Sequence, residues 1–259
     1  VRSGGRCLRL DYAGLQADRV SRVSTPILPP EAGARYGGAW QVQATPRLCS
    51  GMTATLEGVA GGEQTGAATA RLFVRHLAAD GTPTAVIYGR AARLQPGKAL
   101  RLALQVPDTG GWPVQDLGLE IRATGGASSG TLYVGAVTFS GRPRLSFPVQ
   151  ALLTESGGAP GWVCDADRIQ NHPFSDDAEP VMRLQKNQGR GVMVTGSEDW
   201  TDYTLESRVN VHLAEAAGLI VRYQGLQRYL ALVKTRDRLQ LVERYYGDTV
   251  LGEVRARWK

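Results

Sequence analysis

The sequence has no long hydrophobic run and no convincing stretch with helical spacing of apolar residues. No window approaches the roughly 18 consecutive apolar residues that a membrane span requires, so we expect no membrane partner. No basic segment followed by an apolar one opens the chain, which slightly favours a cytoplasmic location over secretion. The first residue is Val rather than Met, which predicts a processed or excised fragment.

Cysteine is scarce, with only Cys7, Cys49 and Cys164 in the chain. None of them has Cys-x-x-Cys spacing or a nearby pair of histidines, so the sequence predicts no structural zinc site. Cys7 and Cys49 could pair across a sheet, which would leave Cys164 over. Because an odd number of cysteines makes a poor disulfide framework, we expect three buried, reduced thiols.

Lysine is scarce as well, because only four of the 30 basic residues are lysines. The excess of positive charge lies in the first 150 residues, where arginines such as Arg71, Arg75 and Arg93 occur singly along strand-like segments. A nucleic-acid-binding protein usually concentrates such charge in one patch or on one helix. The pattern therefore argues against nucleic acid as a partner and favours a solvated strand face.

Alternation of apolar and polar residues with a period of two dominates the chain and predicts an all-β fold. Leu100, Leu102 and Leu104 share one face of a predicted strand and Arg101 lies on the other, as an antiparallel sandwich with one dry face requires. Short strands at regular spacing, separated by turn signals such as Pro96-Gly97, are typical of β-sandwiches and barrels. The strands expected in the first half are 6–12, 20–25, 39–44, 53–59, 70–77, 85–88, 99–106, 118–123 and 131–139.

Three prolines between residues 141 and 161 exclude a central strand there and predict a linker at 143–161. The linker would separate two β-sandwich domains, 1–142 and 162–259. We expect Trp200 to lie in the core, because it stands at the start of a predicted strand. The strands expected in the second domain are 181–185, 191–195, 203–211, 217–223, 229–234, 238–244 and 249–253.

No group of side chains resembles a self-sufficient active site. Retaining glycoside hydrolases need two carboxyl groups about 5–5.5 Å apart, and the nearest acidic cluster, Glu198-Asp199 with Asp202, is interpreted as turn chemistry and capping. A second acidic group, at 176–179, is interpreted as a solvated loop. The sequence also lacks a Gly-x-Ser-x-Gly nucleophile elbow. Whether the chain is an enzyme is left open.

Three segments of the second half carry a resemblance to a known family: DWTDYTLESRV (199–209), AAGLIVRYQGLQRYLALV (216–233) and DRLQLVERYYGDTVLGE (237–253). They resemble the concanavalin-like sandwich of the 3-keto-disaccharide hydrolase and family 16 glycoside hydrolase-like group. The family pattern continues past a Trp, whereas this chain stops at Trp258-Lys259, so the resemblance implies a sandwich incomplete at its C-terminal end. One alternative function is therefore an enzyme of the 3-keto-disaccharide hydrolase type.

Both halves in this order resemble the C-terminal region of large bacterial ADP-ribosylglycohydrolases. The segments that carry this resemblance in the first half are 8–15, 22–30, 35–40, 106–111 and 130–141. In that family an all-helical N-terminal domain binds two Mg²⁺, and none of that domain is present here. The resemblance implies a parent hydrolase acting on N- or O-glycosidic bonds, and it assigns no catalytic residue and no metal to this chain.

The first half, with its ending GTLYVGAVTFSG (130–141), also resembles a galactose-binding-like jelly roll, the fold of many carbohydrate-binding modules. Many of those modules bind a structural Ca²⁺, for which Asp11 is a candidate oxygen ligand. One carboxylate falls far short of the six to eight oxygens that Ca²⁺ takes. We therefore predict no cofactor.

The predicted function is a non-catalytic accessory region of a modular hydrolase. Its partners would be a carbohydrate or an ADP-ribosylated ligand, together with the N-terminal catalytic domain of the parent chain. Sugar binding needs an exposed aromatic side chain flanked by polar groups. A purely structural or oligomerisation module is the remaining alternative. The candidate ligand contacts are Tyr36, Trp40 and Trp112 beside Gly-rich loops, and Arg222, Tyr229 and Arg244 on neighbouring strands.

Overall fold

The computed structural model describes residues 6–17, 19–28, 46–78, 80–147, 159, 161–171 and 181–256. Every regular element in these ranges is a β-strand, and all strand pairs are antiparallel, which confirms the predicted all-β class. Within the same ranges, no helix is long and apolar enough to cross a membrane.

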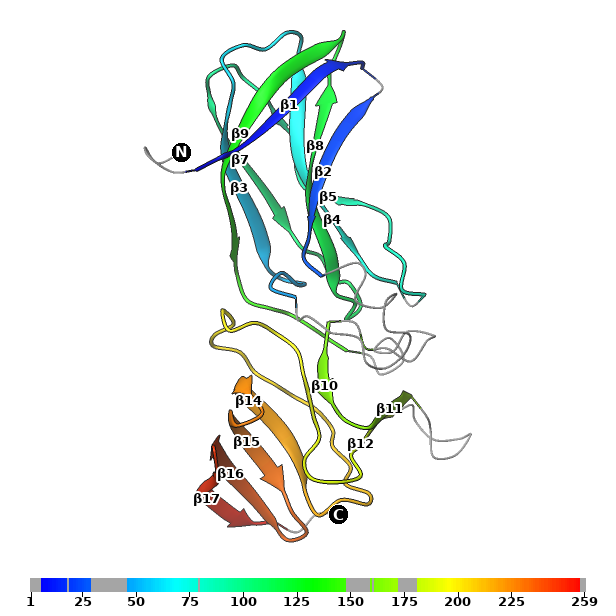
Figure 1. Cartoon of the computed structure of the whole chain (residues 1–259), viewed down its shortest axis with the longest axis vertical. Helices are drawn as coiled ribbons and strands as arrows, with labels where there is room; N and C mark the ends of the chain where they lie inside the picture. The colour runs from blue at the N-terminus through cyan, green and yellow to red at the C-terminus, as the bar shows by residue number, and fades with distance from the viewer. Residues whose placement is uncertain are drawn as a thin grey trace.

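Two sheets pack face to face in the first half of the chain (Figure 1). The four-stranded sheet has the order β1 (Leu8–Leu15), β9 (Ser128–Ser140), β3 (Thr53–Ala60) and β7 (Ala99–Gln105). The five-stranded sheet has the order β2 (Val20–Pro26), β8 (Val114–Ala123), β4 (Ala68–His76) and β5 (Ile87–Tyr88), with β6 (Ala92–Arg93) also pairing with β4.

The core of this sandwich consists of the apolar residues that alternate toward the space between the two sheets. On β7, Leu100, Leu102 and Leu104 are 7%, 2% and 2% exposed, whereas Arg101 between them is exposed. The predicted alternation is thus confirmed. Leu72 on β4 of the facing sheet and Leu132 on β9 of the same sheet as β7 complete the core.

The second half contains a four-stranded sheet in which each strand pairs with the next along the chain (Figure 1). Its strands are β14 (Ala217–Gly225), β15 (Arg228–Lys234), β16 (Arg238–Tyr245) and β17 (Asp248–Arg255). Two further two-stranded sheets pair β10 (Val163–Asp165) with β13 (Val192–Val194) and β11 (Arg168–Asn171) with β12 (Met182–Gln185).

The strand predicted at 203–211 is wrong, because the structure forms no strand there. Its alternating residues Leu205 and Val209 are 46% and 41% exposed. Next to it, the backbone N–H of Arg222 donates to the hydroxyl of Tyr203 (3.3 Å). Alternation predicts which side chains share a face, but a strand also needs a neighbour whose backbone pairs with it.

The other predicted strands in the described ranges are present, with ends that differ by a few residues. The strands that sequence analysis missed are β6, β10 and β11, which have two to four residues each and are too short to show alternation. The strand predicted at 39–44 lies outside the described residues.

Trp200 packs against the core of the first sandwich, as a half-buried side chain, and no strand begins at this position. Trp200 was expected in the core of the second domain. It does contact a core, but that core belongs to the first half of the chain. Beside it, Arg47 and Asp199 form an ion pair (Nη2–Oδ2 2.5 Å) between side chains that are 66% and 52% exposed. An ion pair this exposed adds little stability, so the Trp200 contact is the more important of the two.

The expectation of three buried thiols is wrong for two of the cysteines. All three are free, but Cys7 is exposed and Cys164 is half-buried, and Cys49 alone is buried. Cys7 stands just before β1 at an end of the strand that the core does not cover. Burial raises the pKa of Cys49 to about 12, so its thiolate form is negligible at neutral pH.

This difference predicts the order in which the thiols react with a disulfide reagent at pH 8. Cys7 should react first because it is exposed, and Cys164 more slowly because it is half-buried. Cys49 should react only after unfolding, because burial both covers its thiol and raises its pKa. Absorbance at each stage measures the number of thiols modified. In a Cys7→Ser variant the fast phase should disappear, and modification of Cys49 in the native protein would contradict the structure.

Candidate functional site

The outer face of the five-stranded sheet presents a group of charged and aromatic side chains, which we call the arginine face. Strand pairing sets them in rows across the sheet: Arg22, Glu120 and Arg71 form one row. The arginine face consists of Arg22 on β2, Asp116 and Glu120 on β8, Arg71, Phe73 and Arg75 on β4, and Tyr88 on β5.

Alternation along β8 places acidic residues on this face. Leu117, Leu119 and Ile121 enter the core, so Asp116 and Glu120 lie on the opposite side of the strand. Despite facing outward, Glu120 is only 1% exposed. A charge that is buried this completely must be paired and hydrogen-bonded, and its partners are therefore the first thing to identify.

Three side chains from three other strands hold the Glu120 carboxylate. Arg71 reaches Oε1 through Nη2 (2.6 Å) and Nε (2.8 Å). Arg22 donates from Nε to Oε2 (2.8 Å), and the hydroxyl of Tyr88 donates to the same oxygen (2.9 Å). Burial raises the pKa of Glu120, but the hydrogen bonds from Arg22, Arg71 and Tyr88 outweigh it, and the pKa lies below its usual value.

Tyr88 is fixed by the same arginines that bind Glu120. The guanidinium carbon of Arg71 lies 3.4 Å from the centre of the Tyr88 ring, and Nη2 of Arg22 bonds the Tyr88 hydroxyl. The guanidinium of Arg71 therefore covers one face of the ring, an arrangement that is favourable for a cation and an aromatic group. Each member of the group constrains the others.

Gly118 allows the aromatic part of the arginine face to pack flat on the sheet. A Cβ atom at position 118 would lie 2.2 Å from Cζ of Phe73, so only glycine leaves room for that ring. Phe73 is 3% exposed and meets Tyr88 edge to face, with ring centres 6.4 Å apart. The Phe73 ring thus supports Tyr88 from the side.

Asp116 and Arg75 repeat the same arrangement further along the strands. Asp116 is 6% exposed and accepts from Nε of Arg75 at both oxygens (3.1 Å each) and from its Nη2. Arg71 and Arg75, interpreted from the sequence as part of a solvated face, are instead ion-paired with buried carboxylates. The interpretation as a solvated face is therefore wrong for these two arginines. The carboxylates are buried against the sheet, and the arginines cover them on the solvent side.

The hydrogen bonds among the described residues use Nε and Nη2 of Arg22, Arg71 and Arg75. Nη1 of each of these arginines makes no hydrogen bond within the part of the chain that the structure describes, and its N–H groups suit a further acceptor. The three side chains are 43%, 28% and 37% exposed, so solvent reaches part of each one. The result is a set of cationic donors held in place by buried acids.

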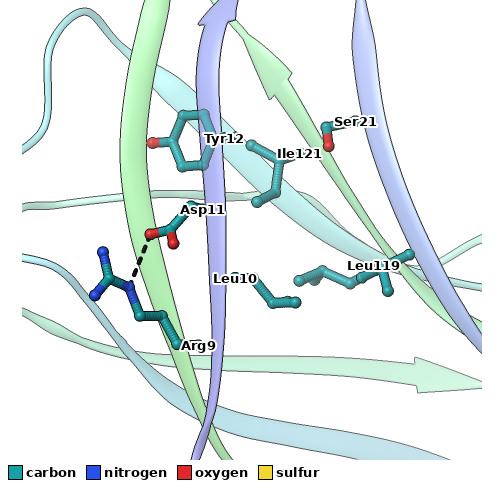
Figure 2. A pocket seen from close by; sticks show the side chains of 8 residues that line it. Arg9, Leu10, Asp11, Tyr12, Ser21, Leu119 and Ile121 are labelled. Atoms are coloured by element: carbon teal, nitrogen blue, oxygen red, sulfur yellow. Dashed lines mark hydrogen bonds and ion pairs between the residues drawn. The ribbon is translucent and has the colours of Figure 1, made fainter.

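A separate cavity of about 170 Å³ opens at the edge of the sandwich where β1 and β2 meet (Figure 2). Leu10 and Leu119 line it, and the pair Arg9–Asp11 stands at its rim. The Asp11 carboxylate accepts from Thr131 (2.6 Å) and Arg9 (3.0 Å), and these hydrogen bonds hold the pKa of Asp11 below its usual value. Asp11, the candidate Ca²⁺ ligand, is thus bonded within the protein.

The described residues contain no group of three or more His, Cys, Asp or Glu side chains that could hold a metal ion. Of the acidic cluster predicted near 199, Asp199 binds Arg47 and Asp202 adopts a positive φ of 52° at a turn. The acidic group at 176–179 lies outside the described residues.

Two of the sequence-predicted contact residues, Tyr229 and Arg244, are cross-strand neighbours on β15 and β16. Tyr229 is 4% exposed, and its hydroxyl accepts from Nη1 of Arg190 (2.8 Å). Asp248 binds both Arg190 and Arg244. Nε of Arg244 is buried and makes no hydrogen bond with the described residues. The tyrosine and the two arginines thus form one connected group around Asp248.

Arg222 is exposed, and no hydrogen bond among the described residues joins it to that group. Its φ is +53°, and the pairing of β14 with β15 shifts register between Val221 and Gly225. Simple alternation fails at such a bulge, because an extra residue changes the direction of the chain. Trp112 is half-buried beside the Gly110-Gly111 turn, and Tyr36 and Trp40 lie outside the described residues.

Sequence reasoning missed Glu120, Tyr88 and Arg22 as members of a common group. A visible signal was the position of Glu120 between Leu119 and Ile121, two apolar residues of a predicted strand. Its partners were not visible, because Arg22, Arg71 and Tyr88 stand 98, 49 and 32 residues away from Glu120 in the sequence.

The sequence matches no family model, and no curated protein matches it. Among solved structures, it is similar to the CBM22-1 xylan-binding domain of Xyn10C from Paenibacillus barcinonensis. The TM-score is 0.26 and the identity 11%, over 57% of this chain and 99% of that domain. A chain in the structure of infectious bursal disease virus, Gx strain, matches with a TM-score of 0.22 and 13% identity, over 52% of this chain and 32% of that one. Likeness at this level identifies neither a family nor a ligand.

The Glu120 network predicts a dependence of stability on pH. Because the pKa of Glu120 is lower in the folded than in the unfolded state, its stabilisation is present at neutral pH and is lost as the pH falls through the folded value. Glu120→Gln should lower the free energy of unfolding at pH 7 by about 2 kcal/mol, since it removes charged hydrogen bonds whose arginine partners stay hydrated.

Urea unfolding of wild type and variant between pH 3 and pH 7 measures this effect. The difference between the two proteins should shrink toward pH 3. Glu63→Gln, which changes an exposed carboxylate, serves as the control and should leave stability within about 0.5 kcal/mol of wild type. A difference that is constant over the whole pH range would contradict the assigned role of Glu120.

Proposed function

We propose that the protein is a carbohydrate-binding accessory region and that the arginine face holds the sugar. The observation that carries the proposal is the Glu120 network, which fixes Arg22, Arg71 and Tyr88 on one solvent-accessible sheet face. Prearranged donors favour binding, because the entropy of ordering these side chains is lost on folding and not again on association.

The chemistry of these donors suits a ligand rich in oxygen acceptors. Arginine presents a planar fork of N–H groups, and the Nη1 atoms of Arg22 and Arg71 lie on side chains that flank one carboxylate. Neighbouring sugar hydroxyls offer oxygen atoms that can accept from both. The Tyr88 hydroxyl donates its only proton to Glu120, so the hydroxyl groups of a sugar would meet donors from two strands, Arg22 on β2 and Arg71 on β4.

The same network favours binding over catalysis. A general acid must carry a proton near neutral pH, whereas the lowered pKa of Glu120 keeps it ionised. Asp116, the other carboxylate of the arginine face, is held by Arg75. The two acids therefore act as anchors for arginines.

In the wider proposal, residues 1–142 form the binding module, 143–161 the linker and 162–259 a second module. The pair would hold the catalytic domain of a parent hydrolase near its substrate, as the resemblance to ADP-ribosylglycohydrolases implies. An ADP-ribosylated ligand would also present hydroxyl acceptors to the arginine face. The carbohydrate proposal is the one that the donors on this face support directly.

The first test is calorimetric titration of the protein with neutral and acidic oligosaccharides and with ADP-ribose. We expect a carbohydrate to bind, and Arg71→Ala to weaken the binding at least tenfold, which corresponds to about 1.4 kcal/mol. Arg9→Ala is the control, because Arg9 is also an ion-paired arginine but lies on the other sheet of the sandwich.

Each variant must first show a cooperative unfolding transition well above the temperature of the titration, although Arg71→Ala should unfold earlier than wild type because Glu120 loses a partner. The Arg9 variant should bind like wild type. If no carbohydrate binds, or if Arg71→Ala binds as tightly as wild type, the arginine face is not the site. Binding of ADP-ribose with loss in the Arg71 variant would move the proposal from oligosaccharides to that ligand.

A further inference from the structure

A second cavity, of about 270 Å³, lies where the chain passes from β6 in the five-stranded sheet to β7 in the four-stranded sheet. Three basic residues, Arg93, Lys98 and Arg101, line it together with Gln95, and no Asp or Glu does. All four are exposed, whereas the floor includes buried Leu94. The cavity, which we call the basic pocket, therefore combines positive charge with an apolar floor.

A tight turn fixes one side of the basic pocket. The N–H of Lys98 donates to the carbonyl of Gln95 (3.0 Å), and Gly97 has a φ of +69°. Pro96 and Gly97 thus occupy the two central positions of a turn that suits proline first and glycine second. The N–H of Ala60 donates to the carbonyl of Lys98 (3.0 Å) and ties the turn to the end of β3. The backbone that carries Lys98 is held at both ends.

The basic pocket adjoins the arginine face on the same sheet. Thr69 on β4 pairs with Arg122 on β8 and with Arg93 on β6, so these residues form a row across the outer face. Residues two apart on a strand are about 7 Å apart, which places this row next to that of Arg71 and Glu120. A ligand lying on the arginine face can therefore extend directly to Arg93.

The charge balance changes along that path. In the rows of Glu120 and Asp116, buried carboxylates offset the arginines. The row of Arg122 and Arg93 contains no carboxylate. Glu57 is the cross-strand neighbour of Arg101, but it does not line the pocket. The lining of the basic pocket thus carries positive charge and no acid, and Glu57 beside Arg101 offsets only part of that charge.

We infer that the basic pocket binds the anionic group of an acidic carbohydrate, a carboxylate or a sulfate ester, whose sugar chain lies on the arginine face. The inference rests on the proposed carbohydrate binding. It adds that the ligand is negatively charged and names the residues that bind the charged group. A cavity lined by two arginines and a lysine suits a group with several oxygen atoms and a negative charge.

Single-stranded nucleic acid also carries negative charge, but it fits the adjacent face less well. Such ligands stack their bases on exposed aromatic rings. Phe73 is only 3% exposed, and Arg71 covers one face of Tyr88. The arginine face thus offers fixed hydrogen-bond donors and little open ring surface, which favours sugar hydroxyls over bases.

The test compares an oligogalacturonate, a sulfated oligosaccharide and a neutral xylo-oligosaccharide of equal length by calorimetry at 50 and 200 mM NaCl. At least one acidic ligand should bind ten times more tightly than the neutral one at low salt. That ratio should fall at the higher salt, because ions screen the charges around this exposed pocket.

Lys98→Gln combined with Arg101→Gln should reduce the acidic-to-neutral ratio at least fivefold. Arg9→Gln removes an exposed charge from the same sheet outside the pocket and should leave the ratio unchanged. Unfolding curves identify any variant whose fold is lost. Should the double variant fail to fold, the single variant Lys98→Gln replaces it, with a smaller reduction expected.

The outcomes separate the inference from the function on which it rests. If neutral and acidic ligands bind equally, or if the double variant keeps the full ratio, the basic pocket has no such role while the carbohydrate proposal stands. If no carbohydrate binds, both fail. An oligothymidylate that binds more tightly than every carbohydrate, and loses its affinity in the double variant, would replace the inference with nucleic-acid binding.

Discussion

The buried carboxylate of Glu120 is the constraint on which the outer sheet face depends. A charge at 1% exposure is tolerated only with close partners of opposite charge, and here they come from β2, β4 and β5. A slip of one residue in any of these strands would turn its side chain into the core. The network therefore fixes the register of the sheet as well as the positions of the arginines.

Local sequence patterns were sufficient to predict most of the longer strands and some of the turns, but not which strands pair with each other. Leu100, Leu102 and Leu104 face the core as their alternation predicts, and Pro96-Gly97 forms the expected turn. Tyr229 and Arg244 were also predicted to lie together, because β15 and β16 are joined by a short hairpin that sets their pairing. Alternation, turn residues and short hairpins all depend on residues that are close together in the sequence.

The failures arose where long-range pairing or a local irregularity decides the structure. Glu120 meets Arg71 because β8 happens to lie beside β4, and nothing within either segment specifies that neighbour. Segment 203–211 alternates well but finds no strand to pair with. Arg222 sits at a bulge with a positive φ, where the period of two on which its predicted face relied is interrupted.

The distribution of acids explains how a modest net charge produces a local positive surface. An acid buried beneath an arginine neutralises it and also fixes its direction, so Arg22, Arg71 and Arg75 act as positioned donors more than as free charges. Arg93, Lys98 and Arg101 share a cavity without such acids. The outer sheet face thus offers oriented hydrogen bonding, and the adjoining pocket an excess of positive charge. A ligand needs both hydroxyl groups and an anion to use the whole surface.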